Sequence, residues 1–169
     1  MMTSLHLNNR QTFWAWARAT WLGWVLGVPS IIVLALLGEA VGIGGAQVLV
    51  GAGMGAGLGL MQSRALRGVL PRPVLWFWSC ALGLALPFLV ADLAKVAEWN
   101  ITYSLYICVA LGGLIVGIWQ ALLLRPRFFN TVWWVVASVV GWATASALAA
   151  VADSLSRSHS VRGLAGALL

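Results

Sequence analysis

Long apolar runs follow one another along the chain with only short polar interruptions. Five stretches come close to the roughly 20 mostly apolar residues that a helix needs to cross a bilayer. They cover residues 14–37, 40–61, 74–91, 101–124 and 131–152. None of the polar segments between them is long enough to fold as a soluble domain. The pattern predicts an all-α integral membrane protein: a bundle of five transmembrane helices in a single transmembrane domain, residues 1–169.

A further apolar run closes the chain. Residues 163–169 follow the polar segment 154–162 and resemble the opening of a sixth helix that runs back inward. An interfacial tail is the alternative. We expect the start of a sixth helix here and a natural chain that continues past Leu169.

Composition supports lipid as the solvent of this chain. Hydrophobic residues make up 62% of it and charged residues only 8%, which leaves too little polar surface to coat a soluble globule. The net charge of +6 comes from short basic clusters between apolar runs. We therefore expect membrane lipids as partners of these clusters, and no nucleic acid.

The basic residues also predict an orientation. With the N-terminus inside, one side of the membrane collects seven arginines and no acid, namely Arg10, Arg18, Arg64, Arg67, Arg72, Arg125 and Arg127. The other side collects Lys95, Arg157 and Arg162 together with the four acids Glu39, Asp92, Glu98 and Asp153. The positive-inside rule then places the N-terminus and the arginine-rich loops in the cytoplasm.

Seven tryptophans fall near the same inner boundary: Trp14, Trp16, Trp76, Trp78, Trp119, Trp133 and Trp134. Indole rings favour the headgroup level of a bilayer. We expect an interfacial belt of tryptophans at that boundary.

An offset of 58 residues reveals an internal repeat. It aligns unlike residues at once, placing Gly55, Gly59, Gln62, Leu66, Arg67, Trp76 and Gly83 on Gly113, Gly117, Gln120, Leu124, Arg125, Trp134 and Gly141. Each unit reads G-x3-G-x2-Q-x3-L-R, a turn, and then W-x6-G in the next helix, with units at about 51–92 and 109–152. Trp16 and Gly23 repeat the second half. We expect a helix-pair duplication in which both copies have the same orientation.

The repeated glycines predict close helix packing. Glycines four residues apart let two membrane helices approach closely. The expected packing residues are Gly51, Gly55, Gly59, Gly83, Gly113, Gly117 and Gly141. Contacts within the bundle and a dimer interface are both compatible with this pattern.

The repeated glutamines allow two interpretations. Gln62 and Gln120 lie just inside the inner boundary, where a carboxamide joins neighbouring helices by hydrogen bonds. Alternatively they contact a lipid or ligand, with Arg67 and Arg125 reaching its phosphate. In that case Trp76 and Trp134 would help to line a groove for a lipid, quinone or pigment ring.

Residues that would indicate catalysis do not form a pattern. None of the five apolar stretches holds an ionisable Asp, Glu, Lys, Arg or His near its centre, which argues against a proton-driven transporter. His6 and His159 stand alone without a second ligand at helical spacing, so no metal site is expected. We expect neither an enzyme nor a required cofactor.

The repeat motif also carries a resemblance. Residues 51–152 resemble uncharacterised bacterial multi-helix membrane proteins whose glycine-rich helices end in Q-W-x-x-L-R and precede a Trp-rich helix. Ser63 and Ala121 stand where those proteins often have Trp. The resemblance implies a helical repeat fold with a further C-terminal helix, integral to a bacterial inner membrane, and no activity.

Two functions fit this sequence. The first is a non-catalytic accessory or scaffold subunit of a larger membrane complex, plausibly bioenergetic (electron-transfer or photosynthetic), with other integral membrane subunits as partners. The second is a carrier or binder of a lipidic or neutral small molecule.

Overall fold

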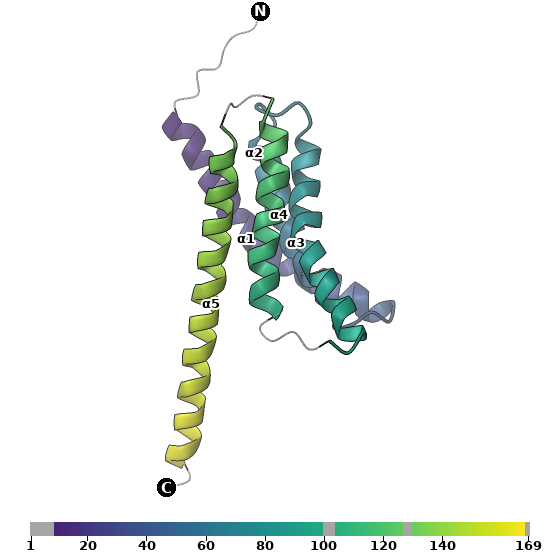
Figure 1. Cartoon of the computed structure of the whole chain (residues 1–169), viewed down its shortest axis with the longest axis vertical. Coiled ribbons are helices and arrows are strands. Elements are labelled where there is room, and N and C mark those ends of the chain that lie inside the picture. Colours follow the sequence, from purple (N-terminus) through teal and green to yellow (C-terminus); the bar gives the residue numbers. More distant parts are fainter. Residues whose placement is uncertain (1–8, 100–103, 127–129, 168–169) are drawn as a thin grey trace, which may run out of the picture.

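The computed structural model describes residues 9–99, 104–126 and 130–167, and this part of the chain is helical apart from short connections. Its five helices are α1 (Asn9–Ala40), α2 (Val48–Ala65), α3 (Pro73–Val96), α4 (Ser104–Leu124) and α5 (Val132–Ala167). Successive helices run in opposite directions (Figure 1). The α2–α3 and α4–α5 connections therefore lie at the end of the bundle where α1 begins, and the other two connections lie at the opposite end.

Each helix packs mainly against its neighbours in the chain. The principal contacts join α1 to α2, α2 to α3, α3 to α4 and α4 to α5. In the described residues α1 and α5 therefore each have a single principal neighbour, and they contact each other through tryptophan side chains.

Four helices are long and apolar enough to cross a membrane: Phe13–Ala40, Pro73–Val96, Leu105–Leu124 and Val132–Ala152. The helix α2 falls below this standard, because five glycines and the Gln62-Ser63-Arg64 segment lower its mean hydropathy. Large apolar side chains project outward along the other helices, among them Ile32, Val90, Ile118 and Val140. Lipid contact accounts for such exposed apolar surface.

Glycine lets α2 pack closely on both sides. A Cβ atom added at Gly53 would lie 2.7 Å from the backbone of Ile31 in α1, and one added at Gly59 would lie 2.7 Å from the carbonyl oxygen of Phe77 in α3. Side chains at these positions would force the helices apart. The glycine-rich sequence thus fixes α2 between α1 and α3.

The connection between α1 and α2 is longer than the apolar pattern predicts. Gly42 and Gly45 adopt positive φ angles of 80° and 76°, which bend the chain before α2 begins. The carboxylate of Asp92 in α3 then accepts hydrogen bonds from the backbone N–H groups of Gln47 and Val48, at 2.9 and 2.8 Å. A carboxylate at a helix N-terminus satisfies orphan donors and complements the helix dipole.

The C-terminal segment differs from the expectation. Its backbone is helical without a break to Ala167, so the polar residues 154–162 do not form a loop and residues 163–167 continue α5 instead of opening a sixth helix. No proline interrupts this stretch, and its serines and arginines are tolerated within a helix. Residues 168 and 169 lie outside the described part.

Candidate functional site: a glutamine and tryptophan cluster beside an open cavity

Gln62 joins three helices near one end of the bundle. Its Nε2 donates to Thr20 Oγ1 of α1 at 3.1 Å. Its Oε1 accepts from Trp76 Nε1 of α3 at 3.0 Å and from Cys80 Sγ at 3.6 Å. Only 8% of the Gln62 side chain is exposed, so these partners replace the hydrogen bonds that water would supply.

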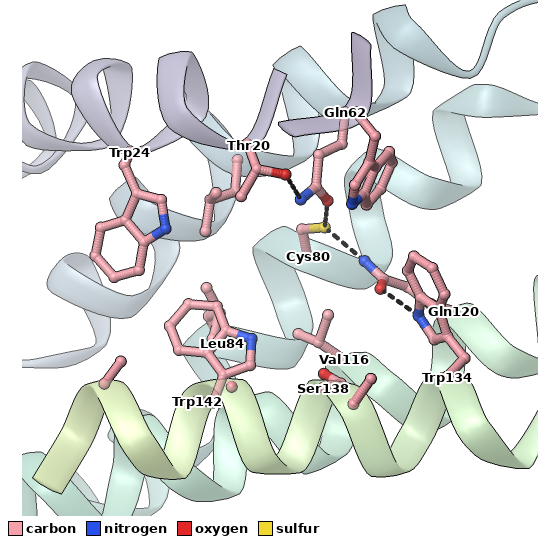
Figure 2. A pocket seen from close by; sticks show the side chains of 15 residues that line it. Thr20, Trp24, Gln62, Cys80, Leu84, Val116, Gln120, Trp134, Ser138 and Trp142 are labelled. Carbon is pink, nitrogen blue, oxygen red and sulfur yellow. Dashed lines mark hydrogen bonds between the residues drawn. The ribbon is translucent and has the colours of Figure 1, made fainter. Parts of the chain in front are cut away.

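Gln120 makes the corresponding contacts from α4. Its Oε1 accepts from Trp134 Nε1 of α5 at 3.0 Å, and its Nε2 donates to Cys80 Sγ at 3.2 Å. Each glutamine therefore bonds the indole N–H of the tryptophan 14 residues further on. Figure 2 shows how the hydrogen bonds run from Thr20 through both carboxamides to Trp134, with the Cys80 thiol between them.

Three tryptophans from alternate helices meet beside these bonds. The ring centroids of Trp16 lie 5.5 Å from those of Trp76 and Trp134, and the latter two lie 5.7 Å apart. All three pairs meet edge to face, an arrangement that aromatic rings favour. These are the three tryptophans that begin the W-x6-G spacing.

This cluster corrects part of the expected interfacial belt. Trp76 has no exposed surface, so it offers nothing to lipid or to a ligand. Trp14, Trp78 and Trp133 do face outward, with 55%, 49% and 69% of their surface exposed. The difference arises because the indole N–H of Trp76 donates to Gln62 inside the bundle, so it does not need a hydrogen-bond acceptor at the headgroup level.

The residues that sequence reasoning missed lie four positions after each clustered tryptophan. Thr20, Cys80 and Ser138 occupy this position on α1, α3 and α5, and all three reach the cavity described below. A small side chain with a hydroxyl or thiol is the property that they share. Aligning all three W-x6-G helices, instead of only the two complete units, would have revealed it.

A cavity of about 420 Å³ opens beside the cluster. All five helices line it, with Trp16, Thr20 and Trp24 from α1, Leu58 and Gln62 from α2, Cys80 and Leu84 from α3, Val116 and Gln120 from α4, and Trp134, Ala137, Ser138, Gly141, Trp142 and Ala145 from α5. Among the lining residues, Trp24 of α1 and Trp142 of α5 contact each other, with ring centroids 5.5 Å apart (Figure 2). Its walls are mostly apolar and carry no charged side chain.

The repeated glycines lie at helix contacts, with one exception. Gly51, Gly55 and Gly59 face α3, Gly113 and Gly117 face Trp142 and Ser138 of α5, and Gly83 faces Val116 of α4. A Cβ atom added at Gly141 would meet nothing within 4 Å. The last glycine of the repeat thus faces open space.

The predicted phosphate partners take no part in the hydrogen bonds of the cluster and do not line the cavity. Arg67 and Arg125 are exposed and follow the ends of α2 and α4. Among the described residues no group of three His, Cys, Asp or Glu side chains is placed to hold a metal ion. His6 lies outside the described residues, as does the side chain of His159.

Comparison with known proteins gives no relative: no family model, curated protein or solved structure matches this chain.

Proposed function

We propose that the protein is a non-catalytic scaffold subunit of a larger membrane complex. The observation that carries this proposal is the open side of the bundle, where α1 and α5 border a cavity and Gly141 faces no neighbour. A glycine in a membrane helix is useful where another helix approaches. A bundle that leaves such a position uncovered is suited to receive a further subunit.

The proposal includes a membrane topology. The 18 residues of α2 extend about 27 Å, and α2 lies between α1 and α3, which are both apolar enough to span. We therefore infer that α2 crosses as a fifth span. The arginine-rich end then faces the cytoplasm of a bacterial cell.

The cluster supports a packing role over a chemical one. Both carboxamides bond partners within the protein, and each of these bonds joins different helices. Interhelical hydrogen bonds of this kind strengthen membrane bundles by about 0.6 to 2 kcal/mol each. The matching contacts of Gln62 and Gln120 are those expected of two copies of one helix-pair unit.

Extraction of native membranes tests the scaffold proposal. A tagged chain released in a mild detergent and measured by native mass spectrometry should carry another integral membrane subunit at fixed stoichiometry. A chain that migrates alone after extraction from several detergents contradicts the proposal.

The cavity favours a second candidate function, the binding of a neutral apolar molecule. Its volume of about 420 Å³ lies within the range of small-molecule sites, and indole rings line two of its walls. Ala145 lines the cavity, whereas Ala143 is exposed elsewhere on α5. In native mass spectra Ala145→Leu should lose a retained small molecule that Ala143→Leu keeps; equal retention dismisses this function.

A further inference from the structure

In the described bundle, α2 packs between α1 and α3, and α4 packs between α3 and α5, but no helix packs between α5 and α1. We call the space between α1 and α5 the groove. Only 17% of the α1 span and 6% of the α5 span are buried, against 50% and 44% for α3 and α4. The described helices therefore form a ring with one position unfilled.

The two filled positions share one set of contacts with the preceding helix. Leu58 of α2 covers Gly23 of α1, and Val116 of α4 covers Gly83 of α3. Four residues later comes the glutamine, whose Nε2 donates to the side chain three residues before that glycine, Thr20 or Cys80. On α5 this pair of positions is held by Gly141 and Ser138, which border the cavity.

The filled positions also share their contacts with the following helix. The glutamine Oε1 accepts from Trp76 on α3 or from Trp134 on α5. Gly59 of α2 packs against Cys80 of α3, and Gly117 of α4 packs against Ser138 of α5. On α1 the corresponding residues are Trp16 and Thr20, and neither of the described glutamines Gln62 and Gln120 accepts a hydrogen bond from Trp16. Thus α5 presents one half of a third interface and α1 presents the other half.

We propose that this groove receives a transmembrane helix of another subunit that carries the pattern Gly-x2-Leu/Val-Gly-x2-Gln. Its aliphatic residue covers Gly141, and its glutamine donates to Ser138 Oγ and accepts from Trp16 Nε1. Ser138 donates its own proton to the carbonyl oxygen of Gly113 at 2.8 Å, so its lone pairs remain able to accept. The proposal rests on the proposed scaffold function and names the chemistry of the partner.

Two ring contacts join α1 directly to α5 at the groove, Trp16 to Trp134 and Trp24 to Trp142, each with ring centroids 5.5 Å apart. Trp16 and Trp76 touch although α2 packs between α1 and α3, and Trp76 and Trp134 touch although α4 packs between α3 and α5. Trp16 and Trp134 touch in the same way at the unfilled position. A helix can therefore lie outside the Trp16–Trp134 pair, as α2 and α4 lie outside theirs. The Trp24–Trp142 pair has no aromatic counterpart at the filled positions, because Leu84 holds this position on α3.

A synthetic peptide provides the test, because α4 itself carries the required pattern. In α4, Cys108 Sγ lies 3.3 Å from the carbonyl oxygen of Pro87 in α3, and Ala145 holds the position of Pro87 on α5. The peptide of residues 104–124 is reconstituted in phosphatidylcholine vesicles with the full chain carrying Cys108→Ser and Ala145→Cys. Oxidation should join the peptide thiol to position 145.

Matched variants make the result specific. Ala143 lies on the opposite face of α5, so Ala143→Cys should cross-link at least about tenfold less. Gln120→Leu in the peptide and Gly141→Leu in the chain should each lower cross-linking about tenfold. Equal cross-linking at positions 143 and 145, or no loss with the leucine peptide, overturns the proposal.

The remaining outcomes are also decisive. The absence of a peptide cross-link overturns the proposal. So does a chain-to-chain disulfide at position 145 whose yield is not lowered by excess peptide, and this result assigns the groove to a second copy. The test uses no native membrane. A peptide cross-link together with a chain that migrates alone in extracts would refute the scaffold function and leave the groove chemistry standing. A chain that carries a partner in extracts but forms no peptide cross-link would refute only the groove chemistry.

Discussion

Among single residues, we expect Gln62 to be sensitive to substitution, because its hydrogen-bond partner Trp76 is fully buried and has no access to water. Gln62→Leu removes the acceptor of the Trp76 indole and leaves a buried N–H unpaired. An unpaired buried donor costs about 1 to 3 kcal/mol. We expect the free energy of unfolding, measured by sodium dodecyl sulfate titration in mixed micelles, to fall by about that amount.

Gln47 supplies the matched control for this substitution. Its Oε1 is buried and has no hydrogen-bond partner among the described residues. Gln47→Leu removes this unpaired atom, so it should leave the free energy of unfolding unchanged or raise it. An equal loss in the two variants would contradict the role assigned to Gln62.

The sequence indicates which residues matter at this scale more readily than it indicates their partners. The repeat singles out Gln62, Gln120, Trp76 and Trp134 from the sequence alone. Their pairing depends on side-chain rotamers and on how closely glycine allows the helices to approach, and neither follows from spacing. A lone thiol in an apolar helix usually acts as a small core side chain, so the sequence does not indicate that Cys80 bonds both glutamines.

Among helix contacts, two glycines of the repeat should respond in opposite ways to the same change. A Cβ atom at Gly55 would lie 2.7 Å from Ala81 Cα of α3, whereas one at Gly141 would meet nothing within 4 Å. Gly55→Ala should lower the free energy of unfolding by about 1 to 3 kcal/mol. Gly141→Ala should raise it by up to about 1 kcal/mol, since alanine favours helix. Changes of the same sign in detergent titrations would contradict these packing contacts.

The start of α2 depends on a carboxylate from another helix. Asp92→Asn removes the charge that accepts from Gln47 and Val48, and charge-assisted bonds of this kind contribute about 1.5 to 3 kcal/mol. We expect faster amide hydrogen exchange at Val48 and a lower free energy of unfolding. The control Glu98→Gln changes an exposed carboxylate in the α3–α4 connection; if it has the same effect, the capping role is refuted.

Helix boundaries show what hydropathy can and cannot predict. The helical architecture of the described residues and four of the apolar spans follow from the pattern of apolar runs along the sequence. The start of α2 at Val48 instead of residue 40 depends on backbone angles at Gly42 and Gly45 and on Asp92, which is distant in sequence. The extension of α5 to Ala167 depends on helix continuity, which hydropathy does not measure.

The whole molecule places its arginine-rich connections at one end, and this arrangement predicts the direction of insertion. The α2–α3 connection contains Gly68 beside Arg67 and Arg72, and the α3–α4 connection contains Ala97 at the opposite end (Figure 1). Both positions are exposed, whereas Cys80 and Cys108 are buried. Cysteines introduced at positions 68 and 97 should therefore react with a membrane-impermeant maleimide without interference from the native thiols.

Positive charge in short loops is retained on the cytoplasmic side. In intact bacterial spheroplasts Ala97→Cys should be labelled and Gly68→Cys should not, and in inverted inner-membrane vesicles the pattern should reverse. Labelling of both positions from one side would mean that α3 does not cross the membrane. The reverse of the expected pattern would mean that the arginine-rich end faces outward, and would overturn the proposed orientation while leaving the helix contacts intact.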